Sequence, residues 1–166
     1  MNISKNKLKN NKKIITDYID KQIKISRVSK VTKGGKKLNF RAIVVVGNKK
    51  GIVGIGVAKA DEISNALKKA KADGLKNLIK FPITKSLSIP HKVITKFGAA
   101  KIILKPSKEG TGIISGGALR VVLEISGIKN ISAKQIGSNN LLNNARACIS
   151  ALQKFTIRNK ISNVSI

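Results

Sequence analysis

Residues Arg27–Ala60 read RVSKVTKGGKKLNFRAIVVVGNKKGIVGIGVAKA, and this stretch decides the fold of the first half of the chain. Runs rich in β-branched residues alternate there with short glycine-containing turns, a pattern that is typical of antiparallel hairpins. The expected strands and turns, which begin slightly before the quoted stretch, are 23–31, 33–36, 38–46, 47–51 and 52–57. The stretch therefore predicts a three-stranded meander.

Residues 60–79 have the clearest helical pattern in the chain. Asp61 can cap the start of this helix. The residues expected on its buried face are Ile63, Ala66, Leu67, Ala70, Gly74 and Leu78. Gly54 and Gly56, inside the third strand, predict either the close approach of a packed neighbour or a bulge. Meander and helix together form a small α+β unit that ends near residue 80, and a short helix is expected over 14–23.

A second unit of strands and helices follows a proline-containing linker or extended crossing at 81–91. Its expected elements are strands at 93–97, 100–105 and 130–136, a loop at 108–112, and helices at 118–126 and 141–155. Gly127 is expected to end the first of these helices. The helix residues expected to face inward are Ala118, Val121, Val122, Ile125, Leu141, Ala145, Cys148, Ile149, Leu152 and Phe155. Two β/α units in tandem are predicted.

The charge of the chain indicates a polyanionic partner. Lys and Arg number 34 against 7 Asp and Glu, which gives a formal net charge of +27. Solubility alone needs a net charge of only about 2–8. Aromatic residues are 3% of the chain, so contacts with phosphates and folded RNA shape are favoured over base stacking. No apolar run is long enough to span a membrane, and no secretory signal pattern is present.

Catalytic chemistry has little support in the sequence. His91 is the one histidine, and the carboxylates are scattered without a nucleophile, a base or a set of metal ligands nearby. Glu124 is expected to pair with Arg120, four residues earlier. Cys148 is the one cysteine and falls on an inward helix face, so neither a disulfide nor a reactive thiol is predicted. The sequence predicts a protein that is not an enzyme and has no cofactor.

Two glycine-containing turns precede the last two helices. The stretch 109–118, EGTGIISGGA, opens a helix where backbone N–H groups can attract an anion. It lacks the Gly-Lys-Ser/Thr ending of a nucleotide-binding loop. A nucleotide pocket, a phosphate contact to a nucleic acid and a plain structural turn all remain open. The turn 137–140 precedes the last helix in the same way, with Ser138 or Asn139 as the expected cap.

The motifs add up to a family resemblance. Together with the quoted stretch at 27–60, EGTGIISGGALRVVLEISGIKNISAKQIGSNNLLNNARA and PITKSLSIPH resemble the bacterial-type small-subunit ribosomal protein five family, from about Ile25 to Phe155. The resemblance implies an N-terminal domain similar to double-stranded-RNA-binding domains. It also implies a C-terminal β/α domain with a left-handed βαβ crossover. The fold class is thus α+β.

The same resemblance implies a function and partners. A member of this family binds small-subunit ribosomal RNA, supports subunit assembly and translational accuracy, and lines the channel through which messenger RNA enters. It contacts small-subunit ribosomal proteins four and eight, and protein three is nearby. The resemblance implies no contact with a membrane. Arg27 and Lys30 match positions that face the incoming messenger, and Thr32–Gly35 match a hairpin tip that reaches RNA of the subunit head.

The candidate RNA-binding residues combine these matches with the basic and polar residues of turns and helix starts. Glycines allow the hairpin to turn and bring its backbone close to RNA, and lysines neutralise phosphates. The candidates are Arg27, Lys30, Lys33, Gly34, Gly35, Lys36, Lys37, Arg41, Lys49, Lys50, Lys59, Lys85, His91, Lys105, Thr111, Ser138, Asn139, Asn140 and Arg146.

The expected organisation is a basic arm at 1–20, a double-stranded-RNA-binding-like domain at 21–84, a C-terminal ribosomal domain at 85–158 and a tail at 159–166. The residues that occupy the motif positions favour a plastid ribosome, with a bacterial cytoplasm as the alternative. Two other functions stay open: a free-standing double-stranded-RNA-binding regulator, and a small-molecule kinase, whose superfamily shares the implied C-terminal topology. Missing catalytic residues argue against the kinase.

Overall fold

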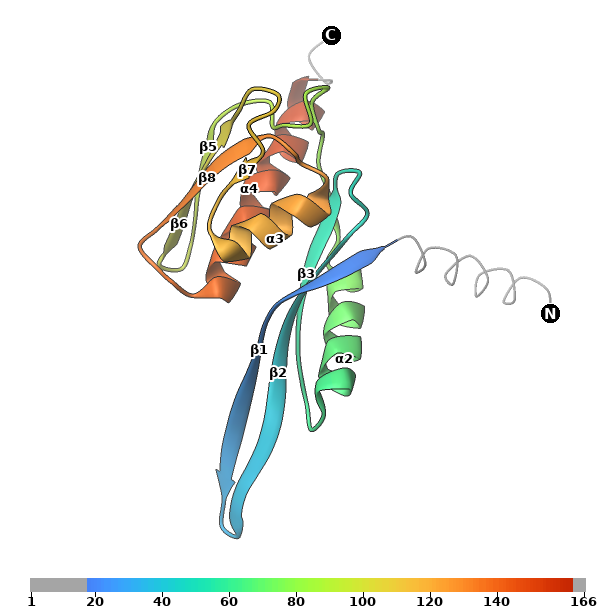
Figure 1. Ribbon diagram of the computed structural model, residues 1–166, viewed down its shortest axis with the longest axis vertical. Helices are drawn as coiled ribbons and strands as arrows, with labels where there is room; N and C mark the ends of the chain where they lie inside the picture. Colours follow the sequence, from blue (N-terminus) through green and yellow to red (C-terminus); the bar gives the residue numbers. More distant parts are fainter. Residues whose placement is uncertain (1–17, 163–166) are drawn as a thin grey trace, which may run out of the picture.

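The computed structural model describes the backbone of residues 18–162 and the side chains of residues 18–155. Two four-stranded sheets, each with its own helical cover, follow one another along the chain (Figure 1). The first sheet carries a long hairpin that projects away from the rest of the molecule (Figure 1). Within the described residues, no helix is both long and apolar enough to cross a membrane.

The first sheet is antiparallel, with the strand order β1-β2-β3-β4. Its strands are β1 (Ile19–Thr32), β2 (Gly35–Gly47), β3 (Ile52–Ala60) and β4 (Ile79–Lys80). The predicted meander is confirmed, and β4 adds a short fourth strand. The helix expected over 14–23 is wrong from Ile19 onward, where the chain is strand; the part before residue 18 lies outside the described residues.

Helix α2 (Ile63–Lys76) covers one face of the first sheet. It starts later than predicted, with Glu62 rather than Asp61 at the N-cap position, and the Glu62 carboxylate accepts no capping hydrogen bond from a backbone N–H of the first turn. Ala66, Ala70 and Gly74 form its buried face. The close approach predicted for Gly56 is confirmed, because a side chain there would run into the backbone carbonyl of Ala70. Strand and helix can approach this closely only without a β-carbon between them.

The second sheet has the order β5-β6-β8-β7, with β7 and β8 parallel and the other pairs antiparallel. Its strands are β5 (Val93–Phe97), β6 (Ala100–Pro106), β7 (Ile113–Ile114) and β8 (Ile131–Ile136). Helix α3 (Gly117–Ser126) connects the parallel pair, and Gly127 ends it at φ +92° as predicted. This crossover unit is the one that the resemblance implies to be left-handed.

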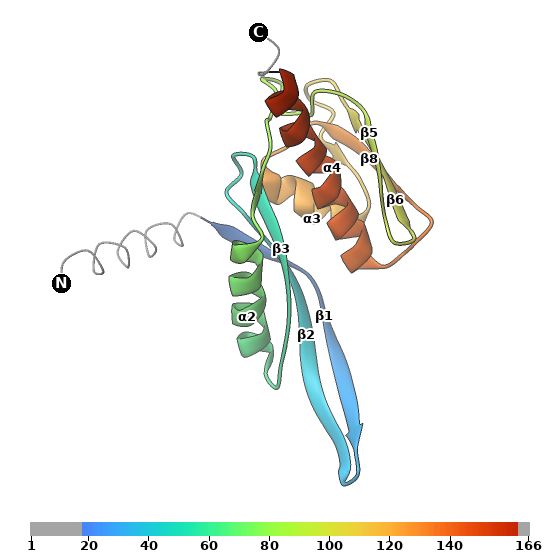
Figure 2. The same cartoon turned by 180° about the vertical axis from the view of Figure 1, so that it is seen from behind.

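The last helix, α4 (Leu141–Ser162), packs with α3 on the same face of the second sheet (Figure 2). It continues into the segment expected as a tail, and 163–166 lie outside the described residues. The cap is Asn140, whose Oδ1 accepts a hydrogen bond from the Leu142 N–H at 3.1 Å, so the expectation of Ser138 or Asn139 is wrong. Leu142 is buried in place of the half-buried Leu141.

The larger hydrophobic core is shared by both halves of the chain. Val45 and Val53 of the first sheet join Leu119, Leu123 and Ile125 of α3 in one cluster. The expected linker belongs to it as well, since Phe81 and Ile89 are 3% and 2% exposed. A second, smaller cluster lies between the first sheet and α2. The two units are therefore packed together rather than strung along a free linker.

Backbone hydrogen bonds reinforce this contact. In the β2–β3 turn, the N–H groups of Lys49 and Gly51 donate to the carbonyls of Ile125 and Ser126, each at 3.0 Å. These carbonyls belong to the last turn of α3, where no intrahelical donor is available. The turn thus completes the end of a helix from the other half of the chain.

Candidate nucleic-acid interface

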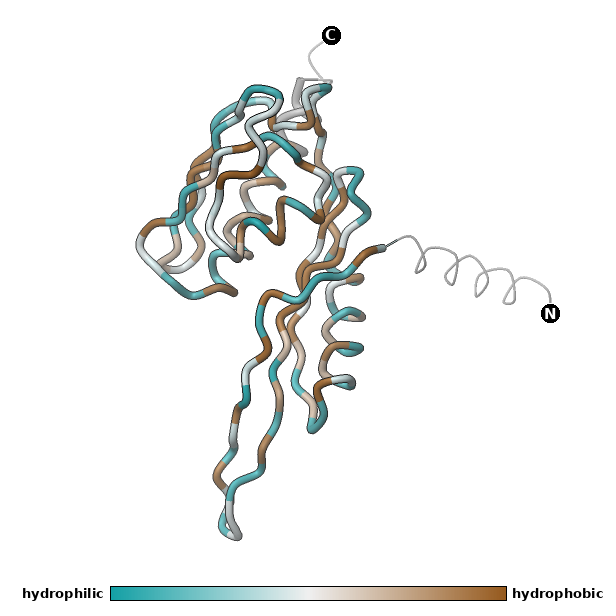
Figure 3. Tube along the Cα trace, viewed as in Figure 1, coloured by the Kyte–Doolittle hydropathy of each residue, from teal (hydrophilic) through white to brown (hydrophobic). Residues whose placement is uncertain are grey.

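The projecting hairpin is a two-stranded ribbon over residues 28–39, because the pairing of β2 with β3 ends at Phe40 and Ala60. We call this segment the ribbon. Teal and brown residues alternate along it in Figure 3, and neither of its strands is covered by a helix (Figure 1). An isolated two-stranded hairpin is marginally stable in water, so its retention beyond the core indicates a partner.

Four lysines crowd the end of the ribbon. Lys30 lies directly opposite Lys37, and Lys36 lies opposite Val31, which is 72% exposed. Lys33 is in the turn. Within the described residues, Lys37 is the one of the four that makes an ion pair, with Asp61 at a long 3.9 Å. Like charges placed directly opposite one another destabilise a hairpin, so this end favours an anion.

The two basic residues matched to the messenger path, Arg27 just before the ribbon and Lys30 within it, point to opposite faces of the β1–β2 hairpin. Side chains alternate along a strand, and Arg27 and Lys30 are separated by an odd number of positions. Arg27 shares its face with Phe40, which packs towards α2. Lys30 shares the other face with Lys37 and Arg41. Together they can contact anions on both sides of the ribbon.

The row of positive charge continues from the ribbon into the sheet. Arg41 is half-buried and lies directly opposite exposed Lys59 in the register of β2 and β3, so two cations again lie side by side. The Arg41 Nε is buried without a hydrogen-bond partner in the described part of the chain. A buried guanidinium nitrogen normally has an acceptor, so Arg41 is an exception to the usual pairing of buried polar groups.

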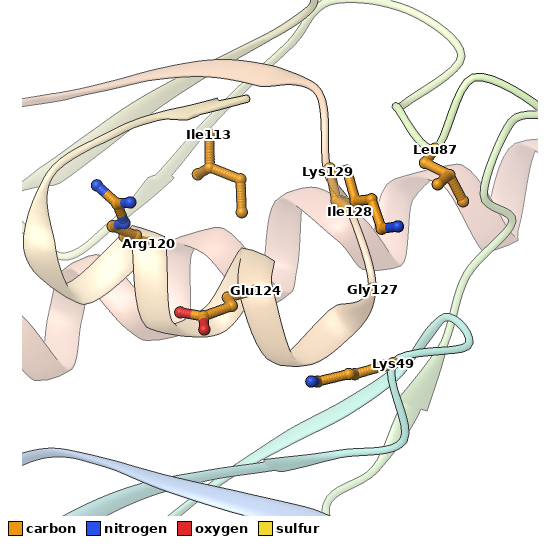
Figure 4. A pocket seen from close by; sticks show the side chains of 8 residues that line it. All are labelled: Lys49, Leu87, Ile113, Arg120, Glu124, Gly127, Ile128 and Lys129. Carbon is orange, nitrogen blue, oxygen red and sulfur yellow. The ribbon is translucent and has the colours of Figure 1, made fainter. Parts of the chain in front are cut away.

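A second group of cations surrounds a hollow between the two halves of the chain. The hollow has a volume of about 590 Å³ and is bordered by Lys49, Arg120 and Lys129, with Glu124 on the same wall (Figure 4). Lys49 and the neighbouring Lys50 are exposed in the β2–β3 turn. Arg120 and Lys129 were not among the sequence candidates, since only the packing of α3 against this turn brings them near Lys49.

The sequence predicts that Glu124 pairs with Arg120, and this prediction is wrong. Glu124 pairs instead with Lys21 of β1, at 2.8 Å. The hydrogen bond from Lys21 is the main reason why the pKa of Glu124 lies below its usual value, and it outweighs the opposing effect of burial. The charges of Lys21, Arg120 and Lys49 lower the pKa further. The pair links the first strand to α3 across the contact between the two halves.

The remaining candidates are dispersed, and several have structural partners. His91 packs edge-on against Phe155, with ring centroids 5.1 Å apart. Arg146 lies over the ring of Phe97 at 5.8 Å, a cation–π contact. Lys85 is exposed in the segment between the sheets, and Lys105 is exposed on the second sheet.

The polar candidates near the helix starts serve local turns. Thr111 donates to the Lys108 carbonyl at 2.8 Å, and Ser138 accepts from the Asn140 N–H at 3.2 Å. Asn139 is exposed. In the glycine-rich segment, Gly116 takes the N-cap position of α3 without a side-chain cap. The ribbon is thus the one place within residues 18–155 where many of the sequence candidates come together.

The described residues were also compared with the arrangements needed for a metal site and for a reactive thiol. No three His, Cys, Asp or Glu side chains among them are arranged to hold a metal ion. Cys148 is fully buried, and burial raises its pKa to about 12, which makes the thiol unreactive at neutral pH.

Comparison with known proteins identifies both halves of the chain. Residues 18–82 match the family described as "Ribosomal protein S5, N-terminal domain", and residues 95–163 match "Ribosomal protein S5, C-terminal domain". The match covers both units, whereas the alternative of a free-standing double-stranded-RNA-binding regulator depends on the first unit alone.

Individual relatives agree. The small ribosomal subunit protein uS5c of Trieres chinensis is 63% identical over 97% of this chain and 88% of its own length. That of Cyanophora paradoxa is 57% identical, covering 83% of this chain and 82% of its own length. The uS5 protein of the cyanobacterium Nostoc punctiforme is 57% identical, covering 89% and 85%.

These relatives settle the class and the compartment. The plastid-type uS5c proteins of diatoms and Cyanophora place the chain in a plastid ribosome, as the residues at the motif positions predict, and cyanobacterial relatives are similar as well. Ribosomal proteins of this kind are structural and not enzymes, which confirms the prediction from the missing catalytic residues. The chain belongs to the ribosomal protein S5 family of the small ribosomal subunit.

Proposed function

We propose that the chain binds small-subunit ribosomal RNA mainly through lysine–phosphate contacts, with the ribbon as its principal contact. The observation that carries the proposal is the placement of Lys30 opposite Lys37, beyond the last residues that β3 supports. Without an anion, this arrangement costs free energy. With a phosphate between the two ammonium groups, repulsion becomes attraction and counterions are released.

The shape of the ribbon supports this role. Its strands are narrow and exposed on both faces, with Lys30 on one face and with Arg27 on the other face at the base of the ribbon. A ribbon of this kind can enter a groove or pass between two RNA segments and neutralise both. The shared core and the β2–β3 turn hold its base in a fixed orientation.

The finer parts of the proposal come from the family resemblance. The unit 21–84 contributes the main RNA contact and 85–158 the second domain of the assembled protein. Arg27 and Lys30 contact messenger RNA where it enters the subunit, and the protein supports subunit assembly and decoding accuracy. Its protein neighbours are small-subunit ribosomal proteins four and eight, with protein three nearby.

The dispersed candidates have a secondary place in the proposal. Lys49 and Lys50, with Arg120 and Lys129 around the hollow, form a second phosphate contact (Figure 4). The glycine-rich stretch before α3 can add backbone N–H groups to RNA contacts, since Gly117 has open space around its α-carbon.

The test is the salt dependence of RNA binding by the full chain. The probe is small-subunit ribosomal RNA transcribed in vitro, bound at a series of salt concentrations. Replacing both Lys30→Gln and Lys37→Gln should weaken binding and lower the salt slope by roughly one for each phosphate that is no longer neutralised. The matched control removes the same charge from two exposed lysines of the second sheet, Lys101→Gln with Lys134→Gln. Equal weakening in both variants would contradict a ribbon-centred contact.

A further inference from the structure

The connection between α3 and β8, residues 125–130, is held from two sides by other parts of the chain. On one side lies the β2–β3 turn, whose N–H groups complete the end of α3. On the other side, the Leu87 carbonyl accepts hydrogen bonds from the N–H groups of Lys129 and Asn130, at 2.8 and 3.2 Å. We call the three segments 47–51, 84–88 and 125–130 together the clasp.

Two residues of the clasp keep an unfavourable backbone conformation. Lys49 and Leu87 have φ values of +55° and +52°, and they are the two residues other than glycine with a positive φ in the described part of the chain. Such a conformation costs free energy and persists where the surrounding structure fixes it. Both residues lie where the clasp contacts the end of α3 and the start of β8. The contact between the halves therefore has one defined geometry.

Close packing in the clasp requires glycine at two positions. A β-carbon on Gly127 would run into the backbone of Lys49, and a β-carbon on Gly47 would run into the side chain of Ile125. Backbone therefore packs directly on backbone between the two halves, which leaves no room for one half to slide against the other.

An ion pair crosses the same contact at the surface. The Lys21 Nζ lies 2.8 Å from the Glu124 carboxylate, on the turn of α3 that leads into the clasp. Lys21 belongs to β1, the strand that continues to the end of the ribbon. The pair therefore joins α3 to one of the two strands that carry the ribbon.

The other strand of the ribbon ends in the clasp itself. β2 runs without interruption from Gly35 at the tip of the hairpin to Gly47 in the clasp (Figure 1). Val44–Val46, just before its end, are at most 1% exposed, so this part of the strand is fixed in the core. The direction in which the ribbon projects from the second half of the chain is therefore set at the clasp.

We infer that the clasp holds the ribbon and the cations around the hollow as one rigid two-point contact for RNA, so that Gly127 and Lys21 are positioning residues that set RNA affinity without touching RNA. This inference rests on the RNA binding proposed above for the ribbon and the hollow. Two contacts held at a fixed separation give the second one a high effective concentration. If the halves moved freely, ordering them would cost part of the binding free energy.

Distances between two spin labels measure this geometry in the free, full-length protein. The labels are attached at Leu38→Cys on the ribbon and Ile94→Cys on β5, which are 43% and 45% exposed, whereas Cys148 is fully buried and stays unlabelled. The distance distribution should broaden in Gly127→Ala. The matched control is Gly110→Ala, because Gly110 has a similar φ of +85° but no atom within 4 Å of an added β-carbon. Equal distributions in the two variants would overturn the inference.

RNA binding then tests whether the geometry matters. The probe is small-subunit ribosomal RNA transcribed in vitro and bound at a series of salt concentrations. Gly127→Ala should bind at least about tenfold more weakly than Gly110→Ala, because the two contacts no longer have a fixed separation. The salt slope should be the same in both variants, since every lysine that neutralises a phosphate is kept. Equal affinities would overturn the inference, and so would a smaller slope in Gly127→Ala.

A charge exchange provides the test if Gly127→Ala fails to fold. Lys21→Glu sets two carboxylates against each other between the halves and should broaden the label distances. Adding Glu124→Lys restores an ion pair and should narrow them again. Lys71→Glu is the matched control, because Lys71 pairs with Asp20 at 2.7 Å within the first half. Equal broadening in Lys71→Glu, or no recovery in the exchanged pair, would overturn the inference.

A last comparison separates this inference from the proposed function. If Lys30→Gln with Lys37→Gln binds RNA as tightly as the unaltered protein, the ribbon contact fails and the two-point contact fails with it. If that variant binds weakly while Gly127→Ala and Gly110→Ala bind alike, the ribbon contact stands and the positioning role of the clasp is overturned.

Discussion

Lys30 and Lys37 face each other across the β1–β2 ribbon, as a directly opposed pair in an antiparallel ladder. Directly opposed β-carbons lie about 4.5–5.5 Å apart, so the two ammonium groups repel each other in the free protein. Two lysines at these positions therefore lower the stability of the free protein, while they favour the binding of RNA phosphates.

Replacing Lys30→Glu should leave the isolated protein as stable as before or more stable, by about 0.2–1 kcal/mol, because the repulsive pair becomes an attractive one. Its affinity for ribosomal RNA should fall, because a carboxylate replaces a phosphate ligand. Thermal denaturation and filter binding measure the two effects. A loss of both stability and affinity would indicate that Lys30 has a structural role instead.

Replacing Gly56→Ala should destabilise the protein by about 1–3 kcal/mol or more, because the new methyl group meets the backbone of α2 at Ala70. The matched control is Gly117→Ala, where no atom lies within 4 Å of the added carbon. The control should be neutral or slightly stabilising, since alanine favours the helix. Urea denaturation compares the two, and equal destabilisation would contradict the close approach of β3 to α2.

Local features of the fold could be predicted from the sequence. The β-branched runs and glycine turns predicted the meander. Gly54 and Gly56 predicted either a packed neighbour or a bulge, and α2 is the packed neighbour. Gly127 was predicted as a helix end, and it adopts the left-handed conformation that favours glycine there. Each of these depends on residues close together in the chain.

Features that depend on tertiary packing could not be predicted. Arg120 lies one helical turn from Glu124, which made it the expected partner, yet Lys21 reaches Glu124 from 103 residues away. The segment 81–91 has no periodicity, so nothing in its sequence indicated that Phe81 and Ile89 complete a shared core. The hollow between the two halves likewise exists only once the strands are in register.

The Lys21–Glu124 pair gives stability a pH dependence of known sign. The pKa of Glu124 is lowered in the folded protein, chiefly by the hydrogen bond from Lys21. The contribution is therefore complete above the unfolded value of about 4.3 and is lost as the pH falls through the folded value. Glu124→Gln should cost about 0.2–1 kcal/mol at neutral pH, since both groups are about half exposed. In acid the variant and the unaltered protein should converge.

Urea denaturation at a series of pH values measures this effect. Glu109→Gln is the matched control, because Glu109 is exposed in a loop and makes no ion pair with another described residue. The control should show no such convergence. A difference for Glu124→Gln that stays constant from neutral to acid pH would mean that its cause is not electrostatic.

Cys148 should react with thiol reagents only when the protein opens. Burial raises the pKa of its thiol to about 12, and no part of the side chain is accessible. The labelling rate of the native protein should therefore equal the rate expected from its opening equilibrium, and it should rise with urea. Denatured protein should label completely, which controls for the intrinsic reactivity. Rapid labelling of the native protein would contradict the burial of Cys148 on the inner face of α4.

The turn of the ribbon allows a final prediction, from two adjacent glycines with different requirements. Gly35 has φ +140°, where a residue with a β-carbon is strained by about 1–3 kcal/mol, while neither glycine has an atom within 4 Å of an added β-carbon. Gly35→Val should therefore open the end of the ribbon and reduce RNA affinity, whereas Gly34→Val should keep the turn. Because the ribbon can open without the core, global stability should change little in either variant. Hydrogen exchange of the ribbon amides and RNA binding measure the difference. If Gly35→Val binds RNA as tightly as Gly34→Val does, the geometry of the turn is not needed for the contact. Exposed lysines alone would then account for the contact.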